Sequence, residues 1–206
     1  MSFQVCRMDV YPVCLTGRVV RLEALSEDHV PELAVAGRDP RIWRYMIYGD
    51  VTTAPAMRRF VWTLLAWQAA GTDLPFAVFH RETGRIVGCT RYLNIRPADR
   101  GLEIGGTWYD VDFQRTAVNT ECKYLLLYHA FETLGCIRVQ LKTDSRNVRS
   151  QRAIERLGAV REGVLRNHMI LPDGTVRDSI FYSILDEEWP AVRARLEEML
   201  VWGVEE

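Results

Sequence analysis

A short polar turn at residues 114–120, Gln-Arg-Thr-Ala-Val-Asn-Thr, is the stretch of this chain best suited to chemistry. Residues 102–109 before it form a predicted strand, and residues 121–134 after it form a predicted helix with a wide apolar face. A strand, a turn and a buried helix direct several unpaired backbone N–H groups into one small space. These amides and the helix dipole favour an anion, usually a phosphate. The alternative is an ordinary strand-to-helix turn.

A second unit of the same kind follows at once. Residues 137–143 form a predicted strand, and residues 144–150 lead into a predicted helix that ends at Gly158. Because the strand, turn and helix recur, the second unit favours the anion site over an ordinary turn.

The two units resemble a known family. Residues 114–119 lie where the GNAT superfamily of acetyl-CoA-dependent N-acetyltransferases has its Gln/Arg-x-x-Gly-x-Gly/Ala pyrophosphate loop. Later segments are similar to the RimJ/RimL-like branch, which is named for enzymes that acetylate the N-termini of ribosomal proteins. These segments are Asn147-x-x-Ser150, residues 153–159, residues 161–166, residues 182–185 and Glu188-Trp189. The resemblance extends from about Leu15 to Leu200, and the order and spacing of the segments carry it.

The resemblance implies that the pantetheine arm of acetyl-CoA lies between the strands at Leu102 and Ile137, which separate there. Unpaired backbone groups on the first strand would orient the thioester carbonyl, and such an amide contributes about 3 kcal/mol in other acyl transfers. The implied cofactor-binding residues are Thr107, Trp108, Tyr109, Arg115, Thr116, Ala117, Val118, Asn119, Thr120, Asn147, Arg149, Ser150 and Arg152.

The loop departs from the family pattern at two positions. Ala117 stands at the usual Gly position and Asn119 at the Gly/Ala position. Asn tolerates left-handed backbone geometry and could instead cap the helix. Ala117 conflicts with the pattern only if its φ must be positive. The backbone amides are present in either case.

Three side chains are candidates for proton transfer. Glu103 lies beside the implied thioester position, where it could act as the general base through a water, and partial burial would raise its pKa. Its alternative is an exposed strand residue in a salt bridge. Many relatives protonate the leaving thiolate with a Tyr on the second crossover helix, which this helix lacks. Ser150 is the candidate acid, and Tyr182 is a second candidate.

The second helix carries more polar groups than one role requires. Asn147 could cap it or bond to the pantetheine amides, and the second role is favoured because Asp144 and Ser145 could also cap. The arginines on this helix form a solvated face, or Arg149 or Arg152 meets a cofactor phosphate, or the cluster contacts ribosomal RNA or protein. The arginines are Arg146, Arg149, Arg152 and Arg156.

Composition limits the class of protein. The chain has 206 residues, 48% hydrophobic content and a formal net charge of −1, which suits a single soluble domain over residues 1–206. Its five cysteines have no paired spacing, so we expect reduced thiols and no metal site. Without a signal-peptide pattern or a membrane-length apolar run, we expect a cytoplasmic protein.

The remaining periodicity predicts one mixed α/β sheet with helices on both faces. An antiparallel meander precedes two parallel crossovers, a hairpin around residues 172–174 and a C-terminal helix at residues 187–201. Residues 1–14 form a loosely held lead-in, and two early helices start at Ser26 and Thr53. The seven predicted strands are residues 17–25, 76–80, 85–93, 102–109, 137–143, 159–165 and 176–184.

Three functions remain open at this point. The resemblance implies acetyl transfer from acetyl-CoA directly to a primary amine, such as a protein N-terminus. The altered loop and the missing tyrosine motivate a catalytically inactive CoA-binding sensor or interaction module instead. An RNA-associated protein is a weaker third reading, so nucleic acid is not an expected partner. The acceptor cannot be read from the residues, and a homodimer is implied only by the family.

Overall fold

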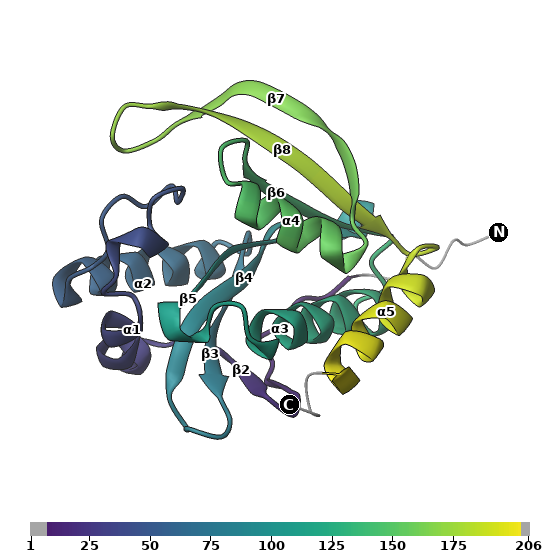
Figure 1. Cartoon of the computed structure of the whole chain (residues 1–206), viewed down its shortest axis with the longest axis horizontal. Helices are drawn as coiled ribbons and strands as arrows, with labels where there is room; N and C mark the ends of the chain where they lie inside the picture. The colour runs from purple at the N-terminus through teal and green to yellow at the C-terminus, as the bar shows by residue number, and fades with distance from the viewer. Residues whose placement is uncertain (1–7, 203–206) are drawn as a thin grey trace.

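One mixed sheet organises the protein. The computed structural model describes residues 8–202 and contains an eight-stranded sheet in the order β1-β2-β3-β4-β5-β6-β8-β7 (Figure 1). The strands are β1 (Leu15–Thr16), β2 (Val20–Ala24), β3 (Leu74–His80), β4 (Ile86–Arg96), β5 (Gly101–Tyr109), β6 (Arg138–Asp144), β7 (Val160–Ile170) and β8 (Val176–Leu185). Strands β2 to β5 form the predicted antiparallel meander, and β5 pairs with β6 in parallel.

Local signals set the ends of the helices. The Thr53 side chain accepts a hydrogen bond from the N–H of Ala56 and caps α2, as predicted. Gly158 ends α4 with a left-handed φ of 104°, a conformation that glycine adopts without strain. The helices are α1 (Val30–Ala36), α2 (Ala54–Ala69), α3 (Ala117–Tyr128), α4 (Val148–Leu157) and α5 (Trp189–Trp202).

Helices cover both faces of the sheet, as predicted. Successive residues of β3 point to opposite sides, so Phe76 and Val78 pack into a core with α3, α4 and α5. Ala77 packs into the second core with α1 and α2. Figure 1 shows α1 and α2 at the left, α3 and α5 at the lower right, and the β7–β8 hairpin arching over the top.

The sheet differs from the prediction in two ways. The prediction of seven strands is wrong because β1, at two residues, is too short to show a period, and it pairs with β2. The second crossover does not produce parallel pairing either. Strand β8 lies between β6 and β7 and is antiparallel to both. Insertion of a later strand between two earlier ones is a tertiary event that local patterns do not encode.

The start of the chain is held more firmly than predicted. Residues 1–7 of the predicted lead-in lie outside the described residues. Met8 is 2% exposed and packs in the larger core, where its sulfur is 3.4 Å from the Cys136 thiol. Cys14, Cys89, Cys122 and Cys136 are free thiols, in agreement with the prediction for the part of the chain described.

Candidate active site

A cavity of about 940 Å³ lies where β5 and β6 separate. The two strands pair only from Gly101–Arg138 to Glu103–Gln140, and β5 then continues to Tyr109 without a neighbour on that side. The separation therefore matches the prediction. Because the sheet is open here, the backbone groups of β5 facing β6 are available to a ligand.

The N-terminus of α3 faces one end of this cavity. Thr116 is the N-cap, and its Oγ1 accepts from the N–H of Val118 at 3.3 Å. The remaining N–H groups of a first helical turn have no intrahelical acceptor. Arg115, Thr116 and Asn119 line the cavity. The predicted anion site is thus a helix N-terminus that opens into a cavity.

The departures of the loop from the family pattern are harmless in this backbone. The helix begins at Ala117 rather than at the predicted Glu121, so Ala117 has an ordinary helical conformation. The positive φ, +65°, falls on Arg115 instead. The suggested capping role of Asn119 is wrong, because Asn119 lies within the first turn and Thr116 is the cap. Neither substitution removes a backbone donor.

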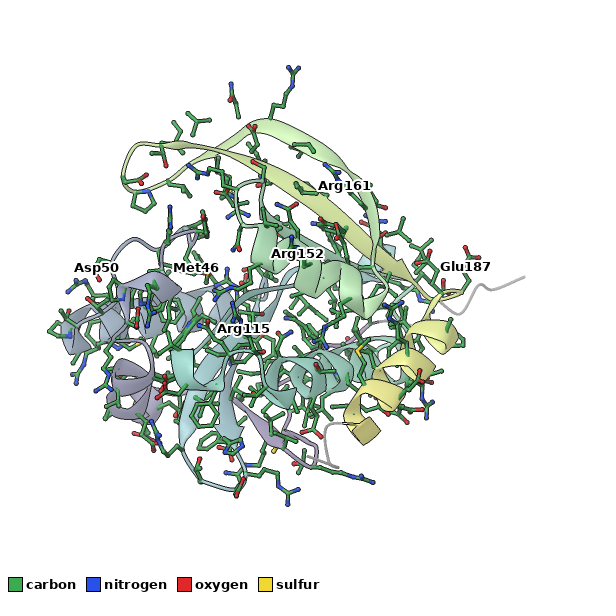
Figure 2. All side chains as sticks on the ribbon, in the orientation of Figure 1. Met46, Asp50, Arg115, Arg152, Arg161 and Glu187 are labelled. Atoms are coloured by element: carbon green, nitrogen blue, oxygen red, sulfur yellow. The ribbon has the colours of Figure 1, made fainter. Side chains whose placement is uncertain are left out.

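Three arginine side chains lie at this end of the cavity. Arg149 donates to Gln114 Oε1 at 2.6 Å, and Arg156 donates to Thr120 Oγ1 at 2.8 Å. The three arginines, Arg115, Arg149 and Arg156, line the cavity. The side chain of Arg152 is exposed on α4 and does not line the cavity (Figure 2). Of the two predicted phosphate contacts, the structure brings Arg149 to the cavity and not Arg152.

Sequence reasoning missed Lys123. This lysine is 6% exposed, lines the cavity, and donates to Thr107 Oγ1 at 2.8 Å. Burial lowers the pKa of Lys123 to about 8. The available signal was a lone lysine among positions of α3 that are otherwise buried, such as Cys122 and Leu126.

The start of α4 faces the same cavity. Asn147 Oδ1 accepts from the N–H of Ser150 at 3.1 Å, so Asn147 caps α4. This oxygen therefore serves the helix and does not bond to a pantetheine amide, the role favoured from the sequence. One of the alternative caps is occupied, since the carboxylate of Asp144 binds Arg146. Both Asn147 and Ser150 line the cavity. Within the described residues, the Asn147 amide nitrogen has no partner and is free for a ligand.

A bulge in β5 shapes the middle of the cavity. Cys89 pairs with Trp108 but Arg91 pairs with Gly105, so β5 has one extra residue, and Gly106 has a φ of +58°. The Trp108 side chain turns into the α1–α2 core, while Thr107 and Trp108 still line the cavity. This arrangement fits the prediction that residues 107–109 contribute backbone groups rather than side chains to the site.

Gly106→Ala tests the bulge. A Cβ at this position would lie 3.2 Å from the Tyr48 hydroxyl and 3.3 Å from Arg91 Nε, on a backbone that disfavours side chains. We expect a loss of stability of about 1–3 kcal/mol and a larger loss of activity. Thermal unfolding and initial rates measure both. Gly84→Ala is a matched control, because Gly84 also has a positive φ, +68°, but lies in the turn after β3 with nothing within 4 Å.

Glu103 lies on β5 at the last position where this strand pairs with β6. It is 1% exposed, and its Oε2 accepts from Asn94 at 2.9 Å, from Gln140 at 2.9 Å and from Lys142 at 3.1 Å. The salt bridge considered as an alternative therefore exists, although the residue is buried rather than exposed. Oε1 accepts no hydrogen bond from the described residues, and Glu103 lines the cavity. One oxygen is fixed and the other is free to meet a water.

The structure does not bring Tyr182 to the site. Its side chain is fully buried, does not line the cavity, and donates from its hydroxyl to Glu155 Oε1 at 3.0 Å. Burial raises the pKa of Tyr182 to about 12. The prediction of Tyr182 as an acid is wrong because Tyr182 faces α4 and the core from β8. Ser150 keeps its place in the cavity.

The other end of the cavity is roofed by the segment between α1 and α2. Of the aromatic and sulfur-containing side chains there, Tyr45, Met46 and Tyr48 line the cavity. Trp43 packs in the core and Trp62 is 48% exposed. The structure therefore separates the aromatic residues that line the cavity from those that pack in the core.

Two observations concern metals and membranes. Between residues 8 and 202, no three His, Cys, Asp or Glu side chains gather in a way that would hold a metal ion. Within the same residues, no helix has the length and apolar character needed to cross a membrane.

Comparison with known proteins gives the relatives of this chain. The family model described as the acetyltransferase (GNAT) domain matches residues 20–160. YdaF of Bacillus subtilis (strain 168), which is named as a ribosomal N-acetyltransferase, is 30% identical over 106 residues. That match covers 52% of this chain and spans only 57% of YdaF. YoaA of the same strain, named as an N-acetyltransferase, is 22% identical over 178 residues, covering 85% of this chain and 98% of YoaA.

Solved structures share the fold over nearly the whole chain. A structure from T. thermophilus, described as an acetyltransferase, has a TM-score of 0.84 at 42% identity, covering 93% of this chain and 98% of that chain. A GCN5-related N-acetyltransferase from Brucella melitensis has a TM-score of 0.86 at 28% identity, covering 92% and 86%. Mycobacterium smegmatis RimJ, solved with CoA-disulfide, has a TM-score of 0.78 at 22% identity, covering 92% and 95%. At that identity RimJ shows the shared fold.

Proposed function

Since this chain belongs to the acetyltransferase (GNAT) family, we propose that it transfers acetyl from acetyl-CoA to a primary amine within the cavity between β5 and β6. The observation that carries the proposal is the meeting of the α3 N-terminus with Arg115, Arg149 and Arg156 beside the point where the strands separate. Backbone amides, a helix dipole and three arginines suit a diphosphate.

The cavity suits the cofactor in size as well as in charge. Its volume of about 940 Å³ reaches the upper part of the usual range for ligand sites, roughly 300–1,000 Å³. Acetyl-CoA supplies a thioester that the amine attacks and from which the thiolate leaves. After Glu103, β5 no longer pairs with β6, so its backbone N–H and C=O groups on that side are unpaired by a strand. These groups would align a pantetheine chain.

Glu103 is proposed to take the proton of the acceptor amine. Glu103 lines the cavity and its Oε1 accepts no hydrogen bond from the described residues, while the bonds from Asn94, Gln140 and Lys142 hold Oε2. A base that acts through one water needs only this placement. Holding the amine and the thioester together removes much of the entropy cost of a two-body encounter.

Lys123 is proposed to donate the proton to the leaving thiolate. A free cysteine thiol has a pKa of about 8.5, close to the value of about 8 to which burial lowers the pKa of Lys123. Similar pKa values make proton transfer between two groups efficient. Ser150, whose hydroxyl is a poor acid, would hydrogen-bond the sulfur.

The acceptor is proposed to be an N-terminal α-amine of a protein. An α-amine has a pKa of about 8 and a lysine about 10.4, so the first needs less help to lose its proton. The name of YdaF, a ribosomal N-acetyltransferase, supports a protein acceptor. The inactive sensor loses one of its two motives, because Ala117 lies in the first turn of α3 and needs no positive φ.

The test combines binding with turnover. We expect acetyl-CoA to raise the unfolding temperature and free thiol to appear with a panel of N-terminal peptides. Stabilisation without thiol release from any amine would support the sensor. No shift at millimolar cofactor would reject the proposal, since a ligand at 100 times its Kd stabilises by about 2.7 kcal/mol.

A further inference from the structure

The acceptor half of the cavity is strongly basic, although the whole chain has a formal net charge of −1. This half is bounded by the segment between α1 and α2, the centre of the sheet and the β7–β8 hairpin. Its acidic side chains are Glu103 and Asp144. Its basic side chains are Arg41, Arg44, Arg91, Lys142, Arg146 and Arg177.

Most of the cations in this half already have a carboxylate. The ion pairs are Arg41–Asp39 at 2.6 Å, Arg91–Asp73 at 3.0 Å, Lys142–Glu103 at 3.1 Å and Arg146–Asp144 at 2.7 Å. Both carboxylates that line the cavity are therefore held by other cations. Arg44 is exposed at the rim and forms no ion pair within residues 8–202.

Arg177 differs because it is buried and has no ion pair among the described residues. It is 6% exposed, and no carboxylate of the described residues lies within ion-pair distance. Its Nε donates to Ser179 Oγ at 3.0 Å and its Nη1 reaches the Tyr45 carbonyl at 3.5 Å. These partners are neutral. Arg177 lines the cavity, and Nη2 has no acceptor among the described residues.

A buried guanidinium without a counter-ion is unfavourable unless a ligand supplies one. Burial lowers the pKa of Arg177, but a guanidinium group is so basic that it keeps its proton at neutral pH, and desolvation of that charge is strongly unfavourable. Arginine binds a carboxylate through two parallel N–H groups, which an unoccupied Nη2 allows. Asp144 and Glu103 influence Arg177 electrostatically, but both Asp144 oxygens bind Arg146 and Glu103 Oε2 binds Lys142.

We propose that Arg177 binds a carboxylate of the acceptor, so that the preferred substrate is an amine carrying a nearby carboxylate. This inference rests on the proposed function and specifies its acceptor. The carboxylate could belong to an acidic side chain close to a peptide N-terminus, or to a small amino acid. Arg44 at the rim would attract either one.

The wild-type protein provides the first test. Peptides with Asp or Glu at the second or third position are compared with their Asn and Gln isosteres, and small amino acids with their amides. We expect kcat/KM to be at least about tenfold higher for the acid in one of the two series, and that series identifies the source. Equal rates for acid and amide in both series would overturn the inference.

Variants locate the effect. We expect Arg177→Gln to raise KM for the acidic acceptor by about tenfold or more, with little change for its amide and none in acetyl-CoA binding. Arg166→Gln is the matched control, because Arg166 is exposed on β7 and forms no ion pair within residues 8–202. Equal KM changes for acid and amide would contradict the proposal. If Arg177→Gln does not fold, the wild-type series decides.

The outcomes separate the inference from the function on which it rests. Transfer to amines without any preference for the acid would reject the carboxylate site and leave the acetyltransferase intact. Absence of transfer to every amine would reject the proposed function and the acceptor site with it. Intact acetyl-CoA stabilisation of each variant shows that the cofactor end is unaffected.

Discussion

Glu103→Gln is expected to lower kcat by about 100- to 10,000-fold, which is the usual contribution of a general base. The amide keeps the size of the carboxylate and an oxygen that can accept from Asn94 and Gln140. It cannot take a proton from the amine. We therefore expect acetyl-CoA binding and the fold to persist while turnover falls. Single-turnover rates and the unfolding temperature measure the two effects separately.

The structural role of Glu103 makes this comparison necessary. Its bond from Lys142 is an ion pair, and ion pairs also occur at purely structural positions. Glu82→Gln is the control, because Glu82 is exposed in the turn between β3 and β4. If Glu103→Gln has a lower unfolding temperature but a wild-type rate of acetyl transfer when folded, Glu103 is structural and another group takes the proton.

Lys123→Met is expected to lower kcat by about 100-fold and to change its pH dependence. A proton donor acts below its pKa, and burial places the pKa of Lys123 at about 8. In the wild type, the contribution of Lys123 is therefore present at neutral pH and lost above about pH 8. We expect kcat to fall above that pH in the wild type and to show no such fall in Lys123→Met.

Stability should change in the opposite direction. The pKa of Lys123 falls from 10.5 to about 8 on folding, so between those values the unfolded chain binds the extra proton. Wild-type stability attributable to this group therefore rises as the pH increases from 8 to 10.5. At pH 7, Lys123→Met removes a buried charge, and we expect a higher unfolding temperature. A lower temperature together with an unchanged pH profile would make Lys123 a packing residue.

Sequence reasoning worked best where neighbouring residues determine the structure. The strand, turn and helix around Thr116 occupy about 30 consecutive residues, so periodicity and turn chemistry predict them. The same applies to Gly158, where a helix end needs a left-handed residue. The opening between β5 and β6 came from the family resemblance and not from a local pattern.

The rest of the site depends on contacts between distant parts of the chain. Arg177 reaches the cavity because β8 inserts beside β6, which brings it close to Tyr45. Tyr182 was placed wrongly because its face of β8 depends on that register. The choice of helix cap also depends on contacts that the sequence does not show. Asp144 binds Arg146 and Asn147 caps α4.

The central claim is that the α3 N-terminus and the separated strands hold the cofactor. A crystal structure of the protein with coenzyme A tests it directly. We predict the diphosphate at the N–H groups of residues 117–120, and the sulfur between β5 and β6 beyond Glu103. A diphosphate bound elsewhere, or strands paired along their full length in the complex, would contradict the account.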